Sequence, residues 1–264
     1  MKALRTISGV IVAIALATAP FVEYADAQGA PPPHVNNAGA TLAPAEIDRI
    51  IGTMLQRESE NASAKLGYAF TRDEDLKTIG FGGKVTGTFH RSSEHNLDAR
   101  GAFIDRIIYF PIPTLQLSQQ ATAGVLAIED FSLNTTNIGS YYVQFAGRSK
   151  LDELDTFVFD VTPKVADDRS FAGRIWVDDR DLRIVKSQGT FGALAASTHG
   201  PVFEIYREQI DGRYWFPTYI YVDGPLQTDR VSEHIRLVKK FTNYRHATAP
   251  QQAAPPIQQP AFNS

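Results

Sequence analysis

Residues 171–186 read Phe-Ala-Gly-Arg-Ile-Trp-Val-Asp-Asp-Arg-Asp-Leu-Arg-Ile-Val-Lys. Residues typical of β-strands run through 174–177 and again through 182–186. The four residues between these runs, 178–181, are polar and rich in aspartate, which favours a turn. Two strands joined by so short a connection pair antiparallel. The stretch therefore predicts a β-hairpin.

Similar runs occur on both sides of this hairpin. Together they predict a meander of roughly nine to eleven strands. Glycine-containing turns are expected at Gly82-Gly83, at Gly147 and at Asp211-Gly212. The further strand-like runs are 66–72, 85–89, 104–109, 141–145, 157–161, 202–207, 214–221 and 231–244.

One helix precedes the strands. Pro44 suits a first helical turn, and apolar residues then recur at the spacing of a single helical face. This apolar stripe consists of Ile47, Ile50, Ile51, Met54 and Leu55. It predicts a helix that packs on the domain's own sheet, with a membrane-surface or partner helix as the alternative. A weaker helical stretch is expected around 122–128, and residues 134–139 are expected to form a loop.

The composition excludes several classes of protein. The chain has 264 residues, of which 43% are hydrophobic, and a formal net charge of −3. This apolar content excludes a disordered chain. The absence of cysteine excludes disulfides, a thiol nucleophile and Cys-ligated zinc or iron–sulfur sites. The nearly neutral charge argues against a nucleic-acid-binding protein.

The first 27 residues have the features of a secretory signal peptide. Lys2 and Arg5 precede a short apolar run, and the small-residue pattern Ala-Asp-Ala follows at 25–27. We expect cleavage near Ala27 and a periplasmic or secreted protein. No cysteine follows that position, so a lipid anchor is excluded. No stable membrane anchor is expected, and an uncleaved N-terminal anchor is the alternative.

The rest of the chain divides into three parts by composition. Residues 28–41 are rich in proline, glycine and asparagine and are interpreted as a disordered linker. Residues 42–246 carry the helix and the strand-like runs and predict a single β domain. Residues 247–264 form a Pro/Gln/Ala tail with little to bury, which predicts disorder.

The strand pattern also predicts a kind of binding surface. A sheet of so many strands curls because strand twist accumulates, and a curled sheet that does not close leaves a concave face. An apolar concave face is by default a site for an apolar ligand such as an acyl chain. The residues that alternation places inward, and that we expect to contact this ligand, are Phe145, Phe157, Phe159, Ile175, Val177, Ile235 and Leu237.

No catalytic residue, metal site or cofactor is predicted. His90, Glu94 and His95 fall at a strand end and in a polar loop, with a spacing that suits no usual pair of metal ligands. The aspartates of 178–181 lack the glycine and terminal glutamate of a calcium-binding EF-hand loop, so we interpret them as turn residues.

Three stretches, 142–164, 171–186 and 204–218, resemble members of the LolA-like superfamily of exported lipoprotein-sorting proteins. They resemble more closely an uncharacterised soil-bacterial, acidobacterial-type branch of it, and this similarity covers most of 61–244. The resemblance implies a mainly β fold: an antiparallel unclosed half-barrel with an N-terminal helix and one or two short helices over its concave face.

The fold pattern and the resemblance together lead us to expect an exported binding protein that is not an enzyme. Its ligand would be a lipid or the acyl chains of a lipoprotein, and lipoprotein sorting is one form of such a function. Its partners would be the lipidated ligand, lipoproteins or another envelope protein. Two alternatives stay open: a protein–protein interaction or sensor module whose concave face is filled core, and a hydrolase with an unrecognised site.

Overall fold

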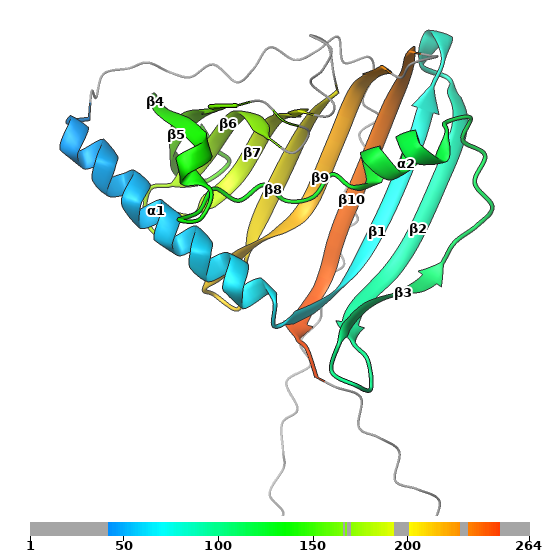
Figure 1. Ribbon diagram of the computed structural model, residues 1–264, viewed down its shortest axis with the longest axis horizontal. Coiled ribbons are helices and arrows are strands. Elements are labelled where there is room, and N and C mark those ends of the chain that lie inside the picture. Colours follow the sequence, from blue (N-terminus) through cyan, green and yellow to red (C-terminus); the bar gives the residue numbers. More distant parts are fainter. Residues whose placement is uncertain (1–41, 166, 168–169, 193–200, 228–231, 249–264) are drawn as a thin grey trace, which may run out of the picture. The chain divides into compact units, whose positions relative to one another are not determined.

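Ten strands pair into one antiparallel sheet in the order β3-β2-β1-β10-β9-β8-β7-β6-β5-β4 (Figure 1). The structure is a computed structural model, and it describes residues 42–165, 167, 170–192, 201–227 and 232–248. In chain order the elements are α1 (Pro44–Lys65), β1 (Tyr68–Ile79), η1 (Phe81–Gly83), β2 (Val85–Leu97), β3 (Phe103–Tyr109), α2 (Gln119–Leu126), η2 (Ile138–Ser140), β4 (Tyr141–Leu151), β5 (Leu154–Pro163), β6 (Phe171–Asp178), β7 (Ile184–Phe191), β8 (Val202–Ile210), β9 (Tyr214–Gln227) and β10 (Ser232–His246).

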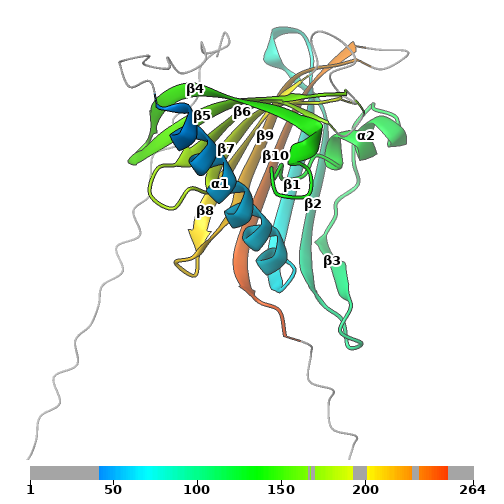
Figure 2. The same ribbon diagram turned by 60° about the vertical axis from the view of Figure 1, so that its left-hand side comes forward.

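The predicted fold class is confirmed. In the described residues β3 and β4 are the two edges of the sheet and do not pair with each other, so the sheet is unclosed. It curves, and α1 and α2 lie on its concave side (Figures 1 and 2). The hairpin that begins in β6 forms as expected, with its turn between Asp178 and Ile184.

Three local expectations were wrong. Gly147 is not a turn residue: β4 runs through it with a register shift, and Gly147 takes a φ of 135°, which glycine adopts readily. The strands β1 and β2 extend well beyond 66–72 and 85–89, so His90 and His95 lie within β2 rather than at a strand end or in a loop. In the parts of β1 and β2 that were missed, inward positions carry charged residues that bond to one another across the strands, as Arg91 bonds to Glu74. These charged residues interrupt the apolar alternation from which strands were predicted.

The chain order of the sheet has a topological consequence. Strands β3 and β4 are consecutive in sequence yet lie at opposite edges, nine strand spacings or about 43 Å apart along the sheet. Residues 110–140, which we call the crossing segment, must therefore pass over the sheet. They do so on the concave side and contain α2 (Figure 1).

The main core lies between the concave face, α1 and the crossing segment. Helix α1 contributes Ile50, Met54 and Leu55, which belong to the predicted apolar stripe. The crossing segment contributes Val125, Ile128, Phe131 and Leu133. A second, small cluster of Val158, Trp176 and Val185 lies apart from this core.

The predicted signal peptide and linker lie outside the described residues, as does the tail beyond residue 248. Within the part of the chain that the structure describes, no helix combines the length and the apolar character needed to cross a membrane.

A pair of facing glycines in the sheet gives a test of the packing. Gly173 and Gly189 pair across β6 and β7, and a Cβ on Gly173 would lie 2.2 Å from the backbone oxygen of Gln188 and 2.9 Å from the ring of Phe171. We therefore expect Gly173→Ala to lower the free energy of unfolding in urea by at least about 2 kcal/mol. The control is Gly52→Ala on the open side of α1, where a Cβ meets nothing within 4 Å and the change should stabilise the helix. Equal effects at the two positions would contradict the packing described here.

Candidate functional site

All seven predicted ligand-contacting residues lie on the concave face. Phe145, Phe159 and Ile175 are neighbours across β4, β5 and β6, and Phe157 pairs with Val177 beside them. Ile235 and Leu237 lie on β10, further along the same face. Six of the seven are at most 5% exposed, and Phe145 is partly buried against them. The structure thus brings these residues into one core and covers them, and their role as ligand contacts stays a prediction.

The cover consists of α1 and the crossing segment. The ring of Phe131 stacks on that of Phe171 with centroids 3.9 Å apart, which fixes the middle of the crossing segment on β6. Closer to β3, the backbone N–H of Thr114 donates to the carbonyl of Thr88 on β2. Since the crossing segment has only short helices of its own, those of its backbone groups that are buried and unpaired within the segment need partners on the sheet or on α1.

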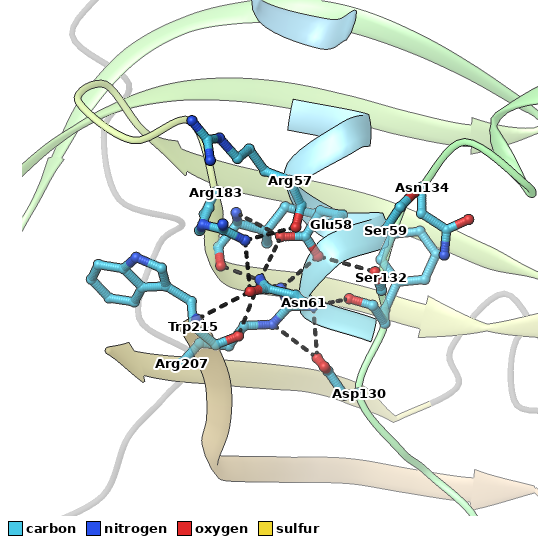
Figure 3. A network of polar contacts seen from close by, with 12 residues as sticks. Arg57, Glu58, Ser59, Asn61, Asp130, Ser132, Asn134, Arg183, Arg207 and Trp215 are labelled. Atoms are coloured by element: carbon cyan, nitrogen blue, oxygen red, sulfur yellow. Dashed lines mark hydrogen bonds and ion pairs between the residues drawn. The ribbon is translucent and has the colours of Figure 1, made fainter. Parts of the chain in front are cut away.

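Arg207 on β8 provides the central anchor of the cover (Figure 3). Its side chain is 1% exposed and points to the concave side, in phase with Phe203 and Ile205. One guanidinium nitrogen, Nη1, donates to Glu58 on α1 at 2.7 Å. The other, Nη2, donates to Asp130 at 2.9 Å and to the carbonyl oxygen of Phe131 at 2.6 Å. A single side chain therefore joins the sheet, α1 and the crossing segment.

Glu58 completes this anchor from the side of α1. Its carboxylate is fully buried and accepts hydrogen bonds from Ser132 Oγ at 3.0 Å, from the backbone N–H of Ile184 at 3.2 Å and from Asn61 Nδ2 at 3.3 Å. Because the buried carboxylate has both an ionic partner and several donors, its desolvation is compensated (Figure 3).

The C-terminal half of α1 is held by Arg183, which follows the β6–β7 turn. The Arg183 side chain is 2% exposed and donates to Asn61 Oδ1 at 2.7 Å and to the carbonyl oxygen of Arg57 at 2.7 Å. It also pairs with Glu60 at 2.9 Å. Helix α1 thus rests on the sheet through apolar residues in its first half and polar residues in its second.

Lys239 on β10 provides a second anchor, below α2. Its fully buried ammonium donates to the carbonyl oxygens of Leu126 at 2.6 Å and Ile128 at 2.9 Å, just where α2 ends. A cation at this point satisfies free helix carbonyls and favours the helix dipole. Glu74 on β1, 3.2 Å away, balances the charge and is itself paired with Arg91.

The electrostatics of the central anchor favour a permanently charged Arg207. Burial alone would lower the pKa of its guanidinium, but the carboxylates of Asp130 and Glu58 more than offset this and raise that pKa above its ordinary value. The ion pair is therefore present at every pH at which the two carboxylates are ionised.

Sequence reasoning missed these anchoring residues, although each leaves a signal. Glu58 and Asn61 continue the buried face of α1, four and seven residues after Met54, so polar residues occupy the end of an apolar stripe. Arg207 and Lys239 likewise occupy inward positions of their strands. A charged residue in phase with a core stripe predicts a buried ion pair.

The residues weighed as metal or catalytic candidates do not converge. His95 lies on the concave side, where Nδ1 is 2.8 Å from Asp105, whereas alternation turns His90 and Glu94 to the opposite side. Glu94 there accepts hydrogen bonds from Arg106 and Arg245. Among the described residues, no group of three or more carboxylate or histidine side chains is arranged to hold a metal ion.

Comparisons with known proteins show similarity of structure at low sequence identity. A DUF1329 family protein from Desulfovibrio piger has 15% identity and a TM-score of 0.38, over 76% of this chain and 92% of that one. A putative outer membrane lipoprotein-sorting protein domain from Vibrio parahaemolyticus has 12% identity and a TM-score of 0.36, over 72% and 91%. The LolA superfamily protein NE2245 from Nitrosomonas europaea has 14% identity and a TM-score of 0.33, over 77% and 94%. No protein-family model matches the chain, and no curated protein matches it.

Removal of Arg207 tests whether its ion pairs hold the cover. Arg207→Met leaves the Glu58 carboxylate buried without a counter-charge, so we expect a loss of about 3–5 kcal/mol in the free energy of unfolding, measured in urea. The double variant Glu58→Gln/Arg207→Met should recover a large part of that loss because the fully buried charge is gone, while Asp130, 14% exposed, keeps some contact with water. Glu46→Gln, which breaks the exposed pair with Arg49, is the control and should leave the urea midpoint unchanged. A single Arg207→Met variant as stable as this control would contradict the assignment.

The β6–β7 turn predicts a specific pH dependence. Burial, together with the adjacent Asp181, raises the pKa of Asp178 to about 6. The folded state therefore binds a proton that the unfolded state releases near pH 4, and stability falls as the pH rises from about 4 to 6. We expect Asp178→Asn to be more stable than the wild type at pH 7 and equal to it at pH 4, measured by urea unfolding. Asp179→Asn, in the same turn, is the control for the loss of one charge. If the free energy of unfolding of Asp178→Asn depends on pH as that of the wild type does, the prediction is refuted.

Proposed function

We propose that this protein is an exported binding protein that holds an apolar or lipidated ligand on the concave face of its sheet, beneath α1 and the crossing segment. The ligand would be a lipid or the acyl chains of a lipoprotein, and lipoprotein sorting is the specific form of this function. The observation that carries the proposal is the construction of the cover. An apolar sheet face is covered by a chain segment whose attachment depends on buried polar anchors.

Such a cover can be exchanged for an acyl chain at a moderate cost in free energy. The apolar contacts of Phe131 or Leu133 with the sheet are replaced by those of the ligand, at about 25 cal/mol per Å² in both cases. The groups around Arg207 and Lys239 become hydrated when the cover lifts. Hydration offsets much of the lost ion pairing, because burying charges is itself costly. The sheet, whose strands pair with one another, keeps its structure throughout.

We also propose that the protein is exported and related to the LolA-like superfamily. Export follows from the predicted signal peptide at residues 1–27, with cleavage near Ala27. Three stretches resemble an uncharacterised soil-bacterial branch of the LolA-like superfamily, and this resemblance supports a binding function in the cell envelope. They are residues 142–164, 171–186 and 204–218. The protein would bind and release its ligand without chemistry, and its partners would be lipoproteins or another envelope protein.

One observation favours a second candidate, an interaction module whose concave face is permanently filled. The inward residues of β5, β6 and β10, such as Phe159 and Ile175, are fully buried in the covered form. In that case the crossing segment is part of the core and does not lift.

A reversible lock on the cover separates the two candidates. The hydroxyl oxygens of Ser59 on α1 and Thr135 on the crossing segment lie 2.9 Å apart at the surface, and the chain has no cysteine of its own. We expect the Ser59→Cys/Thr135→Cys variant to bind dansyl-undecanoic acid normally when reduced. Binding should be at least about tenfold weaker once a disulfide ties the crossing segment to α1, which Arg183 holds on the sheet. The two single-cysteine variants are the controls, and binding is measured by dansyl fluorescence.

Native mass spectrometry of the wild-type protein, purified from a bacterial periplasm, adds a second readout. Co-purified lipid, displaced by the dansyl probe, is the expected result. A ligand-free mass together with no probe uptake by the wild type would contradict the proposed function and favour the filled core.

A further inference from the structure

Strand β3 is exposed to an extent unusual for a strand. All seven of its residues are exposed, and the chain continues as an exposed apolar segment to Ile112. The large apolar residues of this surface, each between 37% and 92% exposed, are Phe103, Ile104, Ile107, Ile108, Tyr109, Phe110 and Ile112. Contiguous exposed apolar surfaces of this kind mark interaction sites.

The apolar side chains lie on both sides of the strand. Phe103 stacks on the ring of His95, on the concave side of β2, at a centroid distance of 4.8 Å. Tyr109 instead contacts His90, which points to the other side of β2. Ile107 pairs with Ser93 between these contacts. A partner that covers only one face of the sheet would leave half of these side chains in water.

The outer edge of β3 is open. In the described residues β3 pairs with β2 on one side and with no strand on the other. Edge strands are often protected from pairing with another chain by lysine, proline or a β-bulge. Strand β3 contains neither lysine nor proline, and its one register shift lies near its end, between Ile107 and Tyr109. Each of its two charged residues has a partner on this chain, since Asp105 bonds to Arg72 at 2.6 Å and Arg106, with 70% of its side chain exposed, bonds to Glu94 at 2.6 Å. The edge therefore presents unpaired backbone groups flanked by apolar side chains.

These features identify the kind of occupant. A lipid surface cannot satisfy backbone N–H and C=O groups, whereas an added strand satisfies them and also contacts both faces. The chain's own terminal segments do not fit: 247–264 is interrupted by prolines such as Pro256, which lack the N–H that a strand needs, and the proline-free stretch 34–41 has Val35 as its one large apolar residue. A second copy that pairs along the whole of β3 would place Arg106 opposite Arg106, and like charges in that position are destabilising.

We propose that β3 binds an extended, uncharged and proline-free apolar segment of another polypeptide, which adds to the sheet as an eleventh strand beside β3. Alternate side chains of this segment pack on Phe103 and Ile107 on one face and on Ile104 and Tyr109 on the other. The site is at the edge of the sheet, so it does not depend on an open concave face. Failure of one proposal leaves the other unaffected.

Binding of a designed strand peptide tests the proposal. The probe is a fluorescein-labelled peptide of alternating valine and threonine, eight residues long, and its matched control has N-methyl groups on alternate backbone nitrogens. We expect saturable binding of the probe to the full-length protein in fluorescence anisotropy, and at least about tenfold weaker binding of the N-methylated peptide because an edge contact needs those donors. Equal binding of the two peptides, or no binding of the probe, would overturn the proposal.

Variants of the chain locate the site. Ile104→Lys/Ile107→Lys places charges on both faces of β3 at exposed positions, so the fold should persist while probe affinity falls at least about tenfold. Tyr142→Lys is the matched control: it changes a 64% exposed residue on β4, the opposite edge strand, and should bind the probe as the wild type does. Equal weakening by both variants would overturn the assignment to β3. A wild-type protein that sediments as a dimer, together with an Ile104→Lys/Ile107→Lys variant that sediments as a monomer, would also overturn the proposal, since a second copy would then be the occupant.

Discussion

The structure depends on one constraint: an irregular stretch of chain has to cross an apolar sheet face. Because β3 and β4 lie at opposite edges, residues 110–140 must pass over the concave side, and their backbone carbonyls need donors there. Arg207 and Lys239 supply these donors at Phe131 and at Leu126 and Ile128, respectively. Two buried basic side chains thus make the crossing compatible with an otherwise apolar core.

The same arrangement separates two kinds of contact in the cover. Its position is determined by directional bonds, such as those from Arg207 to Glu58 and Asp130, whereas its contact area is apolar. Directional bonds specify one closed arrangement but contribute little net free energy once desolvation is counted. Apolar contacts contribute more and can be replaced by any apolar molecule of similar shape. This division is what a reversible cover over a lipid site requires.

Where the apolar pattern was clear, the sequence predicted the structure well. The first half of α1, the hairpin at 171–186 and the inward alternation of Phe157, Phe159 and Val161 all follow from periodicity. The polar ends of β1 and β2 were missed because their inward residues are charged and satisfy one another across strands. The anchors were missed for a related reason: Glu58 and Arg207 are 149 residues apart, so neither shows its partner in the local sequence.

The central claim is that the crossing segment is a displaceable cover. Hydrogen–deuterium exchange tests it most directly, measured without ligand and with an excess of a saturated fatty acid such as palmitate. The account predicts faster exchange for amides of the crossing segment near Ile128 and Leu133 when the ligand is bound, while amides of β8 and β10 stay protected. Unchanged or slower exchange in the crossing segment, with the fatty acid demonstrably bound, would contradict it.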